Sequence, residues 1–216
     1  MSQFHSDWPE MTLGDVSDKP QYGWSARSSA QGSAYRYLRI TDMTSGQLDW
    51  GTVPFCVDIP PDPNRFLLRD EDILVARSGA TFGRSIRIRD PERALFASYL
   101  IRLRPDTGVV MPAFLEGFLK SPAYWRQVRA SSSGMAQPNV NAKKLAQIRI
   151  PIPPLDEQER IVAALEEQFS RLDALEGALV SVLRKTGVDI DTVRLQHRGG
   201  LRAVVLRDAF TGRLTS

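Results

Sequence analysis

The segment SSSGMAQPNVNAKKLAQIRIPIPPLDEQERIV (residues 131–162) determines the architecture that we expect of this chain. Residues 148–152 alternate apolar and polar side chains like the end of a strand, and the prolines of residues 151–154 prevent a central strand or a helix from continuing. Asp156 can then cap a helix whose apolar residues recur with helical spacing from Ile161 onward. The segment therefore predicts a polar loop, a short strand, a stop and a long helix.

Before this segment, the sequence predicts a mixed α+β domain over residues 1–155. Four short stretches alternate or run apolar at strand length between Gly, Asp and Pro turns: residues 35–40, 72–76, 84–88 and 98–103. Residues 112–128 have apolar side chains at helical spacing, and Pro122 is expected to divide them into two helices. The aromatic residues of this stretch are most simply core residues, because aromatic stripes bury large areas.

After this segment, residues 156–216 form the second expected part, which begins with a long helix that ends near Thr186 and Gly187. Its apolar residues follow a near-heptad spacing: Ile161, Leu165, Phe169, Leu172, Leu175, Leu179 and Val182. A helix of about 30 residues is about 45 Å long, more than a small domain covers. The spacing therefore predicts a coiled-coil-type partner helix along this seam. The alternative is a long helix that packs entirely against its own domain.

Residues 201–210 are expected to form a short terminal helix that docks on a core.

The composition, with 42% hydrophobic and 25% charged residues in 216, is that of an ordinary soluble globular protein. The sequence has neither an apolar run of membrane-spanning length nor the layout of a signal peptide, so we expect a cytoplasmic protein without membrane association. Cys56 is the only cysteine and is expected to be a buried apolar residue. The net charge is +3, and the excess of positive charge lies in residues 1–155.

The first candidate binding segment is residues 77–84, RSGATFGR, where two glycines permit a sharp turn between two arginines. Hydroxyl groups, backbone N–H groups and guanidinium groups of this kind contact phosphate. A hairpin of purely structural purpose is nearly as plausible. The candidate contact residues here are Arg77, Ser78, Gly79, Thr81 and Arg84.

The second candidate binding segment is residues 134–144. Its amides could read adenine edges and its lysines could contact phosphate. Asn and Gln in a loop also often close a turn, and Asn141 lies where the cap of a helix over residues 142–146 would fall. The candidates are Gln137, Asn139, Asn141, Lys143 and Lys144. Weaker candidates are Arg36, Arg39, Gln47 and residues 27–29.

Catalytic chemistry has little support in the sequence. His5 and His197 lie near opposite ends of the chain, and no His/Cys/carboxylate spacing resembles a metal site or a nucleophile with its base. Nor is there a recognisable nucleotide-binding loop, so we expect no cofactor. The alternative of a nuclease would rest on the carboxylates near Asp70 and Asp72.

Six stretches together resemble the specificity subunits of type I restriction-modification systems. Besides residues 131–162, these are Trp8-Pro9 with Leu13-Gly14-Asp15, YLRITDMTSGQLDW (37–50), DEDILVARSGATFGR (70–84), ASYLIRLRP (97–105) and AFTGRL (209–214). They span nearly the whole chain in family order. The resemblance implies a target-recognition domain over residues 1–155, followed by a spacer or dimerisation helix with a C-terminal docking segment over residues 156–216.

The resemblance further implies a noncatalytic subunit that reads one half of a bipartite site in double-stranded DNA and recruits methyltransferase and restriction subunits. A full family subunit has two recognition domains and two such helices, whereas this sequence has one of each. We therefore expect a homodimer, or pairing with a second half-subunit, through the long helix, unless the chain is a fragment. The alternative is a helical protein-interaction scaffold that does not read DNA.

Overall fold

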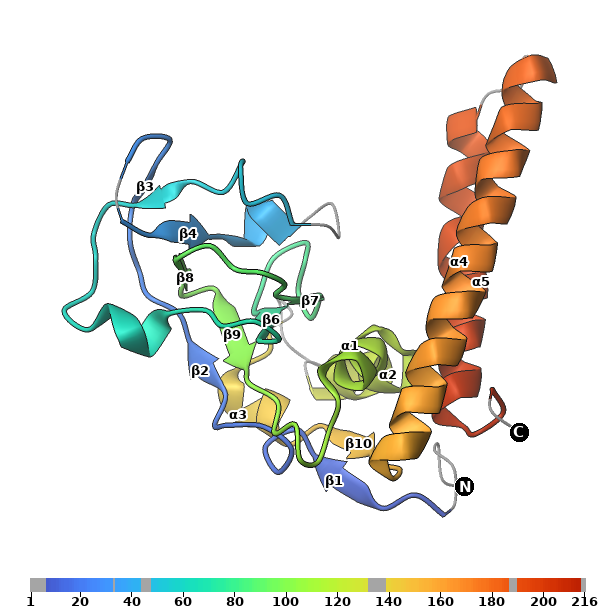
Figure 1. Cartoon of the computed structure of the whole chain (residues 1–216), viewed down its shortest axis with the longest axis horizontal. Helices are drawn as coiled ribbons and strands as arrows, with labels where there is room; N and C mark the ends of the chain where they lie inside the picture. The colour runs from blue at the N-terminus through green and yellow to red at the C-terminus, as the bar shows by residue number, and fades with distance from the viewer. Residues whose placement is uncertain (1–6, 33, 44–47, 132–138, 187–189, 215–216) are drawn as a thin grey trace.

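The computed structural model describes residues 7–32, 34–43, 48–131, 139–186 and 190–214. They form a head of small β-sheets and helices, and a long pair of helices stands at one side of the head (Figure 1). The α+β class expected from the sequence is confirmed. The four expected strands are present, each shorter than its apolar stretch.

The central sheet of the head is antiparallel and four-stranded. Its strands lie in the order β2 (Gln21–Tyr22), β9 (Leu100–Leu103), β6 (Ile73–Ala76) and β7 (Ser85–Arg87). In β6 every side chain is buried. Ile73 and Val75 lie in the core cluster that contains the helices, whereas Leu74 and Ala76 lie in the cluster shared with a second sheet. Both faces of the central sheet are therefore covered, which explains the unbroken apolar run.

The second sheet also has four strands. Their order is β3 (Ser28–Ser29), β5 (Phe55–Cys56), β4 (Arg36–Leu38) and β8 (Ala94–Phe96), and only the β4–β8 pair is parallel. Cys56 is fully buried here, as predicted. Two 3-10 helices flank these strands, η1 (Ile40–Met43) and η2 (Pro63–Phe66). The segment from β2 to β3 runs from the central sheet to this one.

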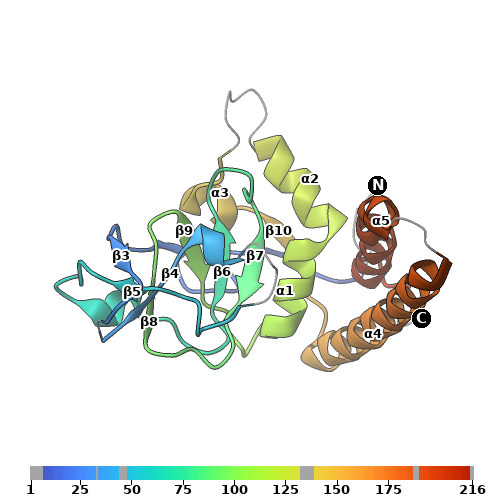
Figure 2. The ribbon, with the colours of Figure 1, turned by 90° about the horizontal axis from the view of Figure 1, so that it is seen from above.

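Helices α1 (Pro112–Lys120) and α2 (Pro122–Ser131) cover the central sheet on the side that faces the long helices (Figure 2). The break between them falls at Ser121 and Pro122, as predicted. Phe114, Phe118 and Tyr124 are fully buried, which confirms that the aromatic residues of this region are core residues.

The strand expected over residues 148–152 is β10 (Arg149–Pro151), which follows α3 (Ala142–Ala146). It pairs with β1 (Glu10–Thr12) in an antiparallel two-stranded sheet, with Met11 opposite Ile150. The partner strand had no clear sequence pattern. This pairing ties the beginning of the chain to the segment that leads from the head into the long helix.

The long helix is α4 (Leu155–Thr186), as predicted, and it runs beside α5 (Ile190–Phe210). Residues 201–210 are helical, as predicted, but the expected short length was wrong, because α5 begins at Ile190 and continues through Gly199 and Gly200. A glycine costs a helix about 1 kcal/mol, which packing of α5 along α4 can offset. The docking of α5 is confirmed at Leu206 and Phe210, which are buried, whereas Val204 is exposed.

The expected seam of α4 divides into two parts. Ile161 and Leu165 are buried in the same core cluster as α1 and the end of α5, so they pack on the chain's own head. Farther along α4, Phe169 and Leu172 are partly exposed. Leu175, Leu179 and Val182 are 50% to 67% exposed. The division of the chain at residue 155 stays a prediction.

Candidate nucleic-acid interface

The loop between β6 and β7 contains the first candidate segment, residues 77–84. Gly79 and Gly83 have φ angles of 80° and 74°, which glycine adopts at no steric cost. Within the loop, the Phe82 N–H donates to the Gly79 carbonyl (3.0 Å) and the Arg84 N–H donates to the Thr81 carbonyl (2.9 Å). The turn is tight, and the Arg84 side chain is exposed beside it.

The second candidate segment lies directly against this loop. Ser78 and Asn139 form an isolated antiparallel bridge, and the Val140 N–H donates to the Arg77 carbonyl at 3.0 Å. The Arg77 guanidinium lies 5.2 Å from the centre of the Tyr22 ring. The fold thus joins two segments about 60 residues apart in sequence into one polar surface, which no local pattern predicted.

The candidates in the second segment have different environments. The Asn141 Oδ1 accepts a hydrogen bond from the Lys144 N–H at 2.8 Å, so Asn141 caps α3, the structural alternative considered for this residue. The Lys144 ammonium donates to the Ser131 carbonyl at 2.6 Å. Lys143 is exposed, and Asn139 is partly exposed. Gln137 and Gln47 lie outside the described residues.

The Arg36 guanidinium is bound by neighbouring groups of the head. It donates to Glu92 (2.7 Å) and to the Val53 carbonyl (2.8 Å), and it lies 4.3 Å from the centre of the Phe55 ring. The side chain is mostly buried. The Arg36 guanidinium is therefore used in contacts within the protein.

Three buried polar atoms in the β6–β7 loop and at the start of β7 have no hydrogen-bond partner among the residues that the structure describes. They are Arg77 Nε, Thr81 Oγ1 and Ser85 Oγ. A buried polar group without a partner costs about 1–3 kcal/mol. Arg77 and Thr81 of the candidate loop therefore retain hydrogen-bonding groups that no described residue satisfies.

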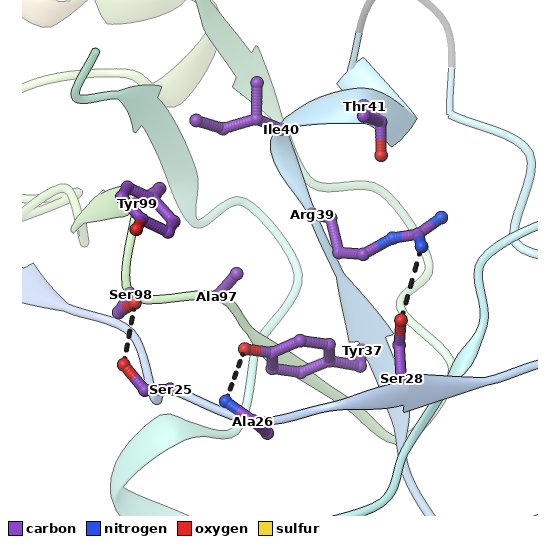
Figure 3. A pocket seen from close by; sticks show the side chains of 10 residues that line it. All are labelled: Ser25, Ala26, Ser28, Tyr37, Arg39, Ile40, Thr41, Ala97, Ser98 and Tyr99. Carbon is purple, nitrogen blue, oxygen red and sulfur yellow. Dashed lines mark hydrogen bonds between the residues drawn. The ribbon is translucent and has the colours of Figure 1, made fainter. Parts of the chain in front are cut away.

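An open pocket with a volume of about 500 Å³ lies at the junction of the two four-stranded sheets. Three segments line it: residues 25–28, 37–41 and 97–99 (Figure 3). Hydrogen bonds between these segments hold the walls of the pocket in place. The Ser25 hydroxyl donates to the Ser98 hydroxyl at 2.9 Å, and the Ala26 N–H donates to the Tyr37 hydroxyl at 3.0 Å.

Arg39 lines the same pocket. Its Nε and Nη2 donate to the Asp42 carboxylate at 3.2 and 2.9 Å. Its Nη1 donates to the Ser28 hydroxyl at 3.3 Å (Figure 3). The hydrogen bond to Asp42 raises the pKa of the guanidinium. The arginine is thus fully charged and fixed in orientation.

Tyr99 connects the pocket to the candidate loop. Its ring is exposed at the pocket wall, with 60% of the residue accessible, and its carbonyl accepts a hydrogen bond from the Arg77 N–H at 2.9 Å. Sequence reasoning missed Tyr99, because tyrosine is common in strands and the residue stands at the start of one. The pocket, the β6–β7 loop and the start of α3 therefore adjoin one another.

The two carboxylates on which the nuclease alternative would rest form contacts within the fold. Asp72 is buried and accepts two hydrogen bonds from Arg104, at 2.7 and 2.9 Å, while Asp70 accepts one from the Asp90 N–H at 2.9 Å. Among the residues that the structure describes, no cluster of three His, Cys, Asp or Glu side chains could hold a metal ion. Over the same residues, no helix has the length and apolarity needed to cross a membrane.

Comparison with known proteins finds similarity to the specificity subunits of type I restriction enzymes. Residues 5–184 match the family model of the type I restriction modification DNA specificity domain. The EcoBI specificity subunit of Escherichia coli is 26% identical over 97% of this chain and 42% of its own length. The StySPI specificity subunit of Salmonella potsdam is 27% identical over 97% of this chain and 44% of its own length.

Two solved structures have a similar fold. The chain matches one in a study of assembly and conformational transition of the type I R-M system, with a TM-score of 0.65, 22% identity, and coverage of 96% of this chain and 47% of the other. It matches the HsdS subunit from Thermoanaerobacter tengcongensis with a TM-score of 0.63, 21% identity, and coverage of 84% and 47%. The chain spans a little under half the length of these relatives. Because the family model matches most of the chain, the protein belongs to the family of type I restriction-modification DNA specificity domains.

Proposed function

We propose that this chain reads DNA sequence as the specificity component of a type I restriction-modification system. The observation that carries the proposal is the convergence of the two candidate segments on one surface, through the Ser78–Asn139 bridge and the hydrogen bond between Val140 and Arg77. A surface that combines exposed cations, backbone N–H groups and a pocket offers both phosphate contacts and base contacts.

Phosphate contact is assigned to the exposed cations of this surface. Arg84 and Lys143 are exposed, and Arg84 stands beside the glycine turn with its unsatisfied polar atoms. Each neutralised phosphate should contribute about 0.9 to the slope of log affinity against log salt concentration. These contacts would position the head on the duplex without reading sequence.

The chain would act without catalysing a reaction, as the noncatalytic partner of a methyltransferase subunit and a restriction subunit. The support is the family membership together with the structural use of Asp70 and Asp72. The head would read one half of a bipartite site, and the α4–α5 pair would set the distance to a second head and dock the partner subunits.

The second head would come from a second copy of this chain. The outer half of α4 supports this, because Leu175 and Leu179 are exposed on a helix that stands beside the head rather than beneath it (Figure 1). Apolar residues at heptad spacing stabilise helix pairs. An antiparallel pair of copies would read a split palindrome, because two-fold symmetry makes the half-sites identical.

Salt-dependent DNA binding tests the surface. We expect the Arg84→Ala, Lys143→Ala double variant to lower the salt slope by about 1.8, because two phosphate contacts are lost. Fluorescence anisotropy with a labelled duplex at several salt concentrations measures it. The control is Arg171→Ala, which removes a cation from the α4 surface and should leave the slope unchanged. A wild-type chain without salt-dependent binding would favour the scaffold alternative.

Methylation mapping tests the whole proposal. The chain is combined with its methyltransferase subunit, and the methylated positions in genomic DNA are sequenced. A methylated split palindrome supports two copies of one head. An asymmetric split site means a second, different head. Absence of sequence-specific methylation with a competent methyltransferase would contradict the proposal.

A further inference from the structure

The pocket contains an arginine whose hydrogen-bonding capacity is only partly used. A guanidinium group has five N–H donors. In Arg39 three of them bind Asp42 and Ser28, one from each nitrogen. Toward the residues that the structure describes, one N–H therefore remains on each terminal nitrogen, and the side chain is 40% exposed. The fold holds this fork at the pocket wall with two donors available.

Arg39 and Asp42 form an ion pair, and its zero net charge favours a neutral ligand over phosphate. Asp42 lies 2.9 Å from Arg39, so the pair has no net charge. A neutral pair gains little from releasing counterions at phosphate, whereas an oriented donor pair still recognises a neutral base edge. Guanine is the base that presents two adjacent acceptors, O6 and N7, in the major groove.

We propose that Arg39 is a specificity-determining residue that reads one guanine through O6 and N7, and that the Tyr99 ring packs against the neighbouring base. This inference rests on the proposed DNA-reading function. Arg39 and Tyr99 line one pocket (Figure 3). The Tyr99 carbonyl accepts a hydrogen bond from Arg77 in the loop assigned to phosphate contact. A DNA duplex that is bound by that loop would therefore lie beside the pocket that contains Arg39 and Tyr99.

The contrast with two other arginines of the head supports this choice. Arg36 is held between a carboxylate, a carbonyl and a phenylalanine ring. Arg102 is buried, and its burial lowers its pKa to about 10. Both serve packing within the head. Arg39, in contrast, has a fixed orientation and two remaining N–H donors, and it lines a pocket.

Selection from a random duplex library with the full chain tests the inference. Wild type should enrich a sequence with a fixed guanine. Arg39→Ala should abolish that preference and lower affinity for the wild-type sequence by about 10- to 100-fold, with an unchanged salt slope. Arg39→Lys should weaken it, because lysine can donate to O6 and N7 but lacks the planar fork. Tyr99→Ala should weaken the preference at the adjacent position.

The controls separate folding, charge and function. Arg171→Ala should keep the wild-type preference. Thermal unfolding by circular dichroism verifies the fold of each variant, and Tyr99→Ala and Arg39→Lys test the inference if Arg39→Ala unfolds. An unchanged preference in Arg39→Ala, or an equal loss of affinity for all sequences, would overturn the inference alone. A wild-type chain that enriches no sequence would overturn both the inference and the proposed function.

Discussion

Asp72 shows how a single residue decides between two interpretations. Its buried carboxylate accepts two hydrogen bonds from Arg104 and one from the Arg69 N–H. We expect Asp72→Asn to lower the free energy of unfolding by about 3 kcal/mol, because it leaves a partly buried guanidinium without its counter-charge. Urea denaturation measures this loss. Asp70→Asn, at an exposed carboxylate, should cost much less. Equal effects in the two variants would contradict this account.

Asn141 combines a structural role with a predicted binding role, and two substitutions separate them. Asn141→Ala should lower stability by about 1 kcal/mol, because the cap of α3 is lost. Asn141→Asp should keep the cap and the stability, but it would remove the amide donor needed to read adenine. Chemical denaturation measures the first effect and library selection the second. An unchanged DNA preference in Asn141→Asp would leave Asn141 with the capping role alone.

At the scale of elements, the connection between the two four-stranded sheets depends on a glycine. A Cβ at Gly23 would lie 2.2 Å from the Phe96 carbonyl oxygen and 2.4 Å from that of Ala97. These are backbone atoms that cannot move alone, so we expect Gly23→Ala to cost at least about 3 kcal/mol and to disturb the pocket beside it. Thermal unfolding and DNA binding measure the two effects.

The matched control is a glycine in a helix. Gly177 lies within α4, and apart from the backbone of α4 itself a Cβ there would meet no atom of the described residues within 4 Å. Gly177→Ala should raise helicity and stabilise α4 by up to about 1 kcal/mol, because alanine loses less backbone entropy. Far-UV circular dichroism measures this gain. Destabilisation by Gly177→Ala would show that the α4 surface near residue 177 is in close contact with another segment.

At the scale of the whole molecule, the proposal of two copies predicts a concentration-dependent dimer. Leu175→Glu with Leu179→Glu places charges on the exposed outer part of α4, where like charges would repel across a pair of copies. We expect the wild-type chain to sediment as a dimer at micromolar concentration and this variant as a monomer. Leu155→Glu, at an exposed position at the beginning of α4, is the control and should leave the dimer intact. A monomeric wild-type chain would contradict the proposal.

The sequence by itself determined the elements whose signals are local. The prolines before α4, the proline between α1 and α2 and the apolar strand of β6 act through backbone sterics and side-chain period, which need no distant partner. For the same reason the long helix and the buried aromatic residues were predictable. The motifs shared with the specificity-subunit family are likewise continuous in sequence.

Tertiary structure alone decided which segments meet. The pairing of β1 with β10, the bridge from Ser78 to Asn139 and the full length of α5 depend on contacts between residues far apart in sequence. Such contacts form because burial in a shared core offsets weak local preference, as it does for the glycines of α5. The pocket with Arg39 and Tyr99 exists only where the two sheets join, so its residues had no common signal in the sequence.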